Sequence, residues 1–341
     1  MTPRERMEAA FDYTGPDRIP LVYHESPAGL HVHGQKLLDL FNRYPPDNPV
    51  TFDAIPGPPA DAVDEEGRYY ELKPDAWGIL WEYRIYGLWG HPKAYPFDGW
   101  AASGAYRFPP LPAIGSDQFE QDRQQVAEQA QEYLVFRGGA SIFERLHNLQ
   151  PMDQVLGDLA AGDADMLSFL DRLTDYWLQD IEYWLAAGAD VFFFGDDWGT
   201  QGAQIVSTRM FREIFKPRYA RLMEPIHRAG KRVFFHTCGH LGELLYELFD
   251  LGVHGIWPQI NQYDEGKLAR ECRDQGVAMY IHPDRQRLVP LGTPEEIDAK
   301  MGEYAERYRD LGGGGIFYVE MENDAPFENV QTLIESIDQH R

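Results

Sequence analysis

The chain has 341 residues but only two cysteines, Cys238 and Cys272, which are far apart in the sequence. They offer no framework of disulfide bonds, and such a composition fits a reducing compartment. No apolar run reaches the ~18 residues that a membrane-spanning helix requires. The first residues are charged and lack the apolar core of a signal peptide. We therefore expect a cytoplasmic protein without a membrane span.

Positive charge is also scarce, because 31 Lys and Arg stand against 55 Asp and Glu, giving a net charge of −24. Nucleic-acid binding needs a positive surface, so nucleic acid is excluded as an expected partner. The glycine run 312–315 lacks the Lys and Ser/Thr of a phosphate-binding loop and is interpreted as a turn. Hydrophobic residues make up 43% of the chain, which is enough for a large core.

Short apolar segments that end in polar residues recur along the chain, and most are followed by a segment with helical periodicity. Alternating strands and helices predict a parallel sheet. Eight such segments predict a single (β/α)₈ barrel domain, a TIM barrel, spanning residues 1–341. The predicted strands are Ile19–Glu25, Val50–Ile55, Tyr133–Ala140, Ala189–Asp197, Arg232–Gly239, Gly255–Ile260, Ala278–Asp284 and Gly314–Glu322.

Residues 56–131 do not fit a minimal barrel, because the segment is too long for a simple connection. It is rich in Trp, Tyr, Gly and Pro, with Trp77 among its aromatic residues. We expect it to cover the barrel mouth as a lid or pocket wall. Its aromatic side chains suit a flat apolar substrate, and packing against the barrel rim explains them equally well.

Chemistry in such barrels occurs at the carboxyl ends of the strands. The polar residues that the prediction places there include several metal ligands and acid–base groups. They are His24, Glu25, Asp53, Asp196, Asp197, His236, Cys238, Gln259, His282, Asp284, Glu320 and Glu322.

His236 and Cys238 are the most informative pair among these residues. They end an apolar strand and are separated by one residue, so both side chains face the same side. Imidazole and thiolate are ligands that suit zinc. The alternative is a buried cysteine beside a histidine that caps the following helix.

Several motifs, in the expected order from about Arg4 to Ile337, resemble the uroporphyrinogen decarboxylase superfamily. The resemblance implies the same barrel fold that the strand pattern predicts. The motifs are Asp75-x-Trp-Gly78, Asp196-Asp-Trp-Gly-Thr-Gln201, Lys216-Pro-x-Tyr219, Gly230-Lys-x-Val-x-x-His-x-Cys-Gly239, Gly292-Thr-Pro-Glu-Glu296 and Asp324-x-Pro-x-Glu-Asn329.

The chain departs from the decarboxylases of this superfamily in its N-terminal region. Those enzymes carry an arginine-rich segment that binds the many carboxylates of the porphyrinogen, whereas residues 21–29 contain no arginine and include Glu25. Arginine is the side chain best suited to pair with carboxylates. We therefore expect that decarboxylation of uroporphyrinogen is not the reaction.

The resemblance is stronger to the superfamily's zinc methyltransferases, which work with corrinoid proteins and share the His-x-Cys pattern at His236 and Cys238. Their third ligand is a second cysteine at the end of the last strand, where this chain has Glu320, or Glu322 two residues later. Cys272 lies in a predicted outer helix and is a poor substitute. Glutamate is an accepted zinc ligand, so the predicted metal site is His236, Cys238 and Glu320.

A carboxylate in place of a thiolate makes the ligand set harder and favours an oxygen substrate. The preferred prediction is therefore O-demethylation of a small methylated compound, such as an aryl methyl ether, with the methyl group passing to cobalamin on a corrinoid protein. The sequence leaves the opposite direction open, in which the corrinoid is the methyl donor and a thiol carrier accepts the methyl group. A partner of that kind and a homodimer are both compatible with the resemblance.

Roles can be assigned to the other candidates under this hypothesis. Asp197, Gln201 and Asp284 are predicted to position the substrate or act in acid–base steps. The predicted substrate-binding residues are His24, Glu25, Trp77, Gln259 and His282.

Two rival hypotheses remain open at this stage. A lyase that decarboxylates a small carboxylated aromatic compound would need an arginine at the strand ends, and Arg137 or Arg285 could serve. A barrel that only binds other molecules is the second rival, but it would have no need for soft metal ligands at a strand tip.

Overall fold

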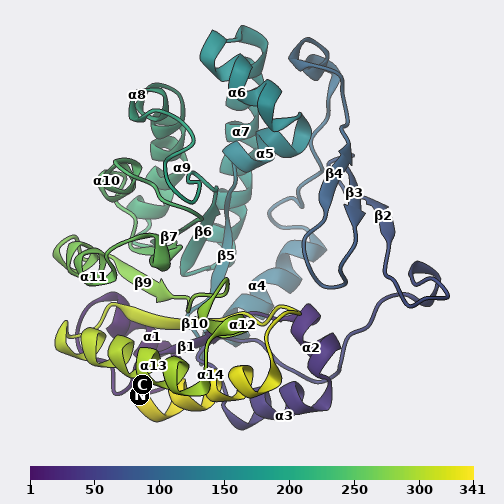
Figure 1. Cartoon of the computed structure of the whole chain (residues 1–341). Helices are drawn as coiled ribbons and strands as arrows, with labels where there is room; N and C mark the ends of the chain where they lie inside the picture. Colours follow the sequence, from purple (N-terminus) through teal and green to yellow (C-terminus); the bar gives the residue numbers. More distant parts are fainter.

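A curled parallel sheet with helices on its outer side forms the centre of the protein in a computed structural model that describes residues 1–341 (Figure 1). The sheet has seven strands in the order β1-β10-β9-β8-β7-β6-β5, and every pair is parallel. Its strands are β1 (Leu21–Tyr23), β5 (Phe136–Ala140), β6 (Val191–Gly195), β7 (Arg232–Thr237), β8 (Gly255–Pro258), β9 (Ala278–Ile281) and β10 (Gly315–Val319).

Helices precede, connect and follow these strands. The α-helices are α1 (Pro3–Phe11), α2 (Pro27–His33), α3 (Gln35–Arg43), α4 (Asp117–Gln129), α5 (Phe143–Leu149), α6 (Met152–Ala161), α7 (Ala164–Ala187), α8 (Thr208–Met210), α9 (Lys216–Arg228), α10 (Leu244–Asp250), α11 (Glu265–Asp274), α12 (Leu288–Leu291), α13 (Pro294–Asp310) and α14 (Phe327–His340). A π-helical turn spans Phe211–Phe215, and 3₁₀ turns span Ala60–Ala62, Trp100–Ala105 and Ile260–Gln262. No helix combines the length and the apolar character needed to cross a membrane.

One predicted strand is wrong. Residues 50–55 form no strand, so the parallel sheet has seven strands and not the predicted eight. The free edge of β1 is instead paired mainly by side chains. Asn48 accepts from the backbone N–H of Tyr23 and donates to its carbonyl, both at 3.0 Å, and Asp47 accepts from Leu21 N at 2.9 Å. Prolines on both sides of Asp47 and Asn48 lack the N–H that a strand ladder requires.

The strands alternate between two hydrophobic cores, as the pleat of a strand requires. Residues such as Phe192 and Phe235 face outward, in the large core under the surrounding helices. Residues of opposite parity, such as Val191 and Phe234, face the interior of the curl, where they meet Phe11 of α1. Because the parity continues beyond each strand, it decides which of the following polar residues point inward.

Residues 56–131 contain a separate antiparallel sheet, which stands beside the curled sheet in Figure 1. Its strands are β2 (Glu71–Pro74), β3 (Leu80–Tyr83) and β4 (His91–Ala94). Trp77, in the turn between β2 and β3, packs on Trp177 and Tyr176 of α7, with ring centroids 5.7 and 5.2 Å apart. That this segment acts as a lid stays a prediction.

Candidate functional site

Because side chains alternate between the two faces of a strand, a group of polar residues faces inward at the carboxyl edge of the curled sheet. Two residues after an inward-facing strand residue, the chain again points inward. The inward residues that end the strands are His24 after β1, Asp197 after β6, His236 in β7 and Cys238 after it, Gln259 after β8, His282 after β9 and Glu320 after β10.

Three of these residues have ligand atoms close enough to share a metal ion. Suitable atoms of Asp197, His236 and Cys238 all lie within 4.8 Å of one another. His236 Nε2 lies 3.6 Å from Cys238 Sγ and 3.5 Å from Asp197 Oδ1. In a tetrahedral zinc site, the usual bond lengths separate such ligand atoms by about 3.3–3.6 Å. The donor atoms therefore fit zinc in chemical type, and the two distances from His236 Nε2 fit it in spacing.

Hydrogen bonds hold these side chains in an orientation suitable for binding a cation. His236 Nδ1 donates to the carbonyl oxygen of Trp257 at 3.0 Å, so the lone pair of Nε2 points toward Cys238 and Asp197. This outer hydrogen bond is a regular feature of histidines that bind metals. Asp197 Oδ1 also accepts from the backbone N–H of Cys238 at 2.7 Å.

Two glycines allow the loops that carry these ligands to approach each other. Gly199 N donates to the carbonyl oxygen of Cys238 at 3.1 Å. Gly239 has a φ of +77°, and a Cβ atom there would lie 2.3 Å from the backbone carbon of Gly199. A side chain at position 239 would therefore be strained and would push the loops apart.

Burial disfavours charge on the ligands themselves. It raises the pKa of the Cys238 thiol to about 12, with a further contribution from the negative charge of Asp197. Burial also lowers the pKa of His236. A bound cation reverses this balance for a thiol, because it stabilises the thiolate directly.

The neighbouring acid, Asp196, points outward and has a structural role. Its side chain is completely buried. It accepts hydrogen bonds from Tyr219 Oη, from Ser141 Oγ at 3.1 Å, and from the backbone N–H groups of Ile142 and Glu144 at 2.8 and 2.7 Å. Asp196 therefore fastens the start of α5 to the end of β6.

The predicted third ligand, Glu320, is not part of the group of three. It lies 3.5 Å from His24 Nδ1 and 3.8 Å from Arg285. Arg285 also pairs with Glu322 at 3.0 Å. β10, which carries Glu320, is three positions from β7 in the sheet order. Glu320 as a zinc ligand stays a prediction.

The remaining predicted residues lie at varied places around the rim. Gln259 accepts from Gly239 N at 3.1 Å and so supports the loop that carries Cys238. Gln201 is exposed and contacts Gln259 and Gln262 at 3.5 and 2.8 Å. Asp284 accepts from the backbone of Gln286 and Arg287 and caps its own turn.

His282 and Glu25 differ in their surroundings. His282 Nδ1 accepts from the indole of Trp257 at 3.3 Å, and burial lowers its pKa. Beneath the polar residues, the rings of Trp257, Tyr280 and Tyr318 form an aromatic floor. Glu25 is exposed and makes no ion pair.

Helix α5 also places ionisable side chains at this edge of the sheet, and they were not among the candidates predicted from the sequence. Burial and the charges of Asp196 and Asp197 raise the pKa of Glu144 to about 8, and Arg145 stacks on the ring of Trp77 at 4.1 Å. Burial also lowers the pKa of His147 in the same helix. Helical periodicity could not have singled them out, but their position immediately after a predicted strand could have.

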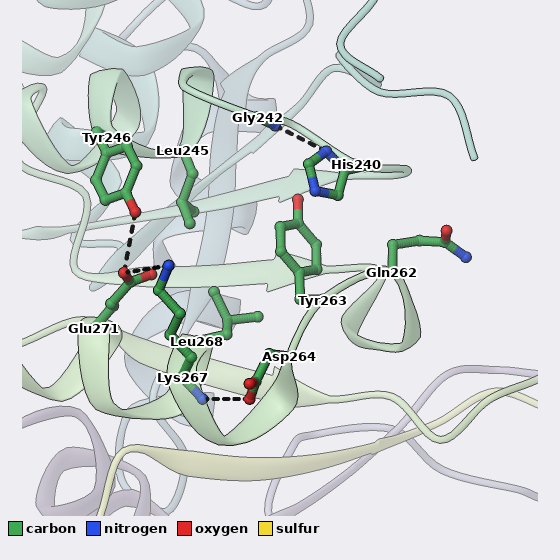
Figure 2. A pocket seen from close by; sticks show the side chains of 10 residues that line it. All are labelled: His240, Gly242, Leu245, Tyr246, Gln262, Tyr263, Asp264, Lys267, Leu268 and Glu271. Atoms are coloured by element: carbon green, nitrogen blue, oxygen red, sulfur yellow. Dashed lines mark hydrogen bonds and ion pairs between the residues drawn. The ribbon is translucent and has the colours of Figure 1, made fainter. Parts of the chain in front are cut away.

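A pocket of about 280 Å³ lies outside the curled sheet, between α10 and α11 (Figure 2). Its polar side chains are largely paired with each other, since Tyr246 Oη donates to Glu271 at 3.0 Å and Lys267 lies 3.7 Å from the same carboxylate. His240 stacks on Tyr263 there, 5.1 Å between ring centroids. This pocket does not include the three candidate ligands.

Comparison with solved structures shows a similar fold over the full length. The chain aligns with a methyltransferase from Methanosarcina mazei at a TM-score of 0.59 and 17% identity, covering 99% of both chains. A dihydropteroate synthase from Xanthomonas albilineans aligns at 0.36 with 13% identity, over 58% of this chain and 65% of the other. An endo-β-1,4-xylanase from Gloeophyllum trabeum aligns at 0.40 with 11% identity, over 66% and 82%. The latter two scores are too low to indicate a common fold.

Sequence comparison gives the family. No curated protein sequence matches the chain significantly. Residues 149–340, more than half of the chain, match the profile described as uroporphyrinogen decarboxylase (URO-D). This region contains the strands that carry Asp197, His236, Cys238 and Glu320. The chain therefore belongs to the uroporphyrinogen decarboxylase family.

Proposed function

We propose that this protein is a zinc-dependent methyltransferase of the demethylating type. It removes a methyl group from a small methylated compound, an aryl methyl ether, and passes it to cobalamin on a corrinoid protein. The observation that carries this proposal is the convergence of an imidazole nitrogen, a thiol and a carboxylate at zinc-like spacing. The activity named for the Methanosarcina mazei structure, which shares the fold, agrees with it.

Three side chains would hold the zinc ion. His236 and Cys238 supply the nitrogen and sulfur, and Asp197 is the carboxylate that lies beside both. Glu320, predicted from the sequence, would take this place only by leaving His24 and Arg285. With three protein ligands, a fourth position is left for substrate, as in catalytic zinc sites. The ion would supply Lewis acidity toward the ether oxygen.

The residues around the centre fix its geometry. The carbonyl of Trp257 keeps His236 in one tautomer, and Gln259 holds the Cys238–Gly239 turn through a backbone N–H. The aromatic floor of Trp257, Tyr280 and Tyr318 excludes water from below and offers flat apolar faces to an aryl group.

The surroundings disfavour the porphyrinogen as substrate. A substrate with many carboxylates needs several free cationic groups. Arg285, which follows the inward-facing residues at the end of β9, already forms ion pairs with Glu320 and Glu322. Arg137, the other arginine considered for a carboxylated substrate, instead contacts Gln129 and Trp184 of the outer helices.

The test is zinc content combined with methyl transfer. Wild-type protein should hold about one zinc per chain, and Cys238→Ala and His236→Ala should lose it. Cys272→Ala is the matched control, because Cys272 is the other cysteine and lies buried in α11. Methoxylated aromatic compounds should methylate reduced cobalamin, followed by its absorption spectrum, in wild type and Cys272→Ala only. A wild-type protein without zinc after reconstitution, or carbon dioxide release in place of methyl transfer, would refute the proposal.

A further inference from the structure

One arginine in the helix that begins beside the candidate metal centre forms no ion pair. Arg145 lies in α5, and its Nε atom is buried without any hydrogen bond. No carboxylate lies within ion-pair distance of it, and burial lowers its pKa. Charged groups in such surroundings are normally paired, because an isolated buried charge is costly.

The nearby acids are committed to other groups. Asp75 accepts from the backbone N–H groups of Trp77 and Ile79 and from the indole of Trp81, each at 2.9 Å. Glu144 precedes Arg145 in α5, but burial and the charges of Asp196 and Asp197 raise the pKa of its carboxyl group to about 8, which disfavours its charged form at neutral pH. Neither acid therefore forms an ion pair with the guanidinium, although both attract it at longer range.

The position of the guanidinium is nonetheless well defined. Arg145 lies with its central carbon 4.1 Å from the ring centre of Trp77, a distance at which a cation and an aromatic face attract each other. Its two terminal nitrogens make no hydrogen bond and are not among the buried unpaired atoms, so they are not completely enclosed. A guanidinium presents two parallel N–H groups to a carboxylate.

Aromatic side chains form a cluster beside it. Trp77, Phe108 and Tyr176 contact one another, with ring centroids 5.2 to 6.0 Å apart. Helix α5, which carries Arg145, is held beside the metal centre. Asp196 binds the first N–H groups of α5, and the next residue, Asp197, lies beside His236. The unpaired cation, the aromatic wall and the candidate ligands therefore belong to one edge of the sheet.

We propose that Arg145, stacked on Trp77, binds the carboxylate of an aromatic substrate whose opposite end reaches the His236–Cys238 centre. For the reacting end this rests on the proposed function, and it narrows the substrate class to aryl methyl ethers that carry a carboxylate, such as methoxybenzoates. The binding of the carboxylate itself requires neither zinc nor methyl transfer.

Calorimetric titration tests the proposal with three probes: 4-methoxybenzoate, the neutral 4-methoxybenzyl alcohol, and benzoate, which has no methyl ether. Wild type should bind 4-methoxybenzoate at least about tenfold more tightly than the alcohol, as expected for charge-assisted hydrogen bonds. Arg145→Gln should lose this preference, and Arg145→Lys should keep part of it, since lysine retains the charge without the planar fork.

Arg137→Gln is the matched control. Arg137 also lies over a tryptophan, 5.9 Å from the ring centre of Trp184, but it has partners in Gln129 and the carbonyl of Phe136. This variant should bind all three probes as wild type does. An unchanged preference in Arg145→Gln, or no preference in wild type, would overturn the proposal. If Arg145→Gln does not fold, an undiminished preference in Arg145→Lys would overturn it equally.

The outcomes separate this proposal from the proposed function. Benzoate binding that depends on Arg145, in a protein that neither holds zinc nor transfers methyl groups, would support the carboxylate site and refute the methyltransferase. Zinc binding and demethylation without any preference for the carboxylate would support the methyltransferase and refute the carboxylate site. Thermal unfolding gives a second readout. Arg145→Gln removes the stacking on Trp77 but also a costly unpaired charge, so the melting temperature should change little.

Discussion

His236 Nε2 lies 3.5 Å from Asp197 Oδ1, and the same oxygen accepts a hydrogen bond from the backbone of Cys238 at 2.7 Å. One carboxylate therefore contacts both residues of the His-x-Cys pattern, across the ends of two adjacent parallel strands. This contact makes Asp197 the acid best placed to complete a metal site.

Asp197→Ala should accordingly weaken zinc binding more than Glu320→Ala does. Loss of a ligand is expected to cost at least the roughly 10–100-fold in affinity that loss of an outer-shell partner costs. Competition with a chromogenic chelator measures the affinity, and Glu25→Ala, at an exposed rim position, is the control. A larger loss in Glu320→Ala would return the third position to the residue predicted from the sequence.

Gly239→Ala should also impair the metal site, without removing any ligand. The added methyl group would meet the backbone of Gly199 at a position with φ +77°, and such strain costs about 1–3 kcal/mol. Gly202→Ala is the matched control, because a Cβ atom there meets nothing within 4 Å. Zinc content and urea unfolding should both distinguish the two variants, and equal zinc content would argue against a role for the close approach of the loops.

Asp196→Ala should destabilise the whole protein. It would leave the buried N–H groups of Ile142 and Glu144 and the hydroxyl of Tyr219 without their acceptor. We expect a loss of about 3 kcal/mol or more in the free energy of unfolding, measured in urea. Tyr219→Phe removes one of these hydrogen bonds and also the one that Trp198 Nε1 donates to Tyr219 Oη at 3.3 Å, and it should cost less, about 2 kcal/mol. Similar losses in the two variants would show that the anchoring of α5 is not due to Asp196.

Acid should destabilise the protein through His254. Burial, His227 and Arg232 lower its pKa to about 4, against an opposing effect of Asp12. The unperturbed pKa is about 6.5, so the unfolded chain takes up a proton that the folded chain does not. Stability from this group is complete above pH ~6.5 and is lost as the pH falls toward ~4.

The size of this effect is modest because the ring is only partly buried. Between pH 7 and 5, wild type should lose about 1 kcal/mol more than His254→Asn, whose amide oxygen can still accept the hydrogen bond from Val233 N. Urea unfolding at the two pH values measures the difference. Equal losses in both proteins would assign the acid sensitivity to another group.

The strand pattern predicted most of the sheet because alternation between apolar runs and polar ends reflects burial directly. It failed at residues 50–55, since Val50 and Phe52 are apolar but the hydrogen bonds of the β1 edge are made by Asp47 and Asn48. Side-chain pairing of this kind leaves no periodic signal.

The sequence predicted that Asp197 lies at the same edge as His236 and Cys238, but the contact between ligands was predictable only where the residues are close in sequence. His236 and Cys238 share one strand, so their proximity follows from backbone geometry. The approach of Asp197 depends on which strands are neighbours and how their ends are staggered. Arg145 stands out only because its charge is unpaired, and that is a property of its surroundings.

The side-chain pairing of β1 also affects how the protein meets other chains. An open sheet normally exposes a strand edge to which another polypeptide can add, and this promotes aggregation. Asp47 and Asn48 already occupy the N–H groups of Leu21 and Tyr23, so this edge offers no free ladder. At the β1 end, the incomplete ring of strands can thus resist edge-to-edge association. The prolines on both sides of Asp47 and Asn48 lack the N–H that pairing with an incoming strand would require.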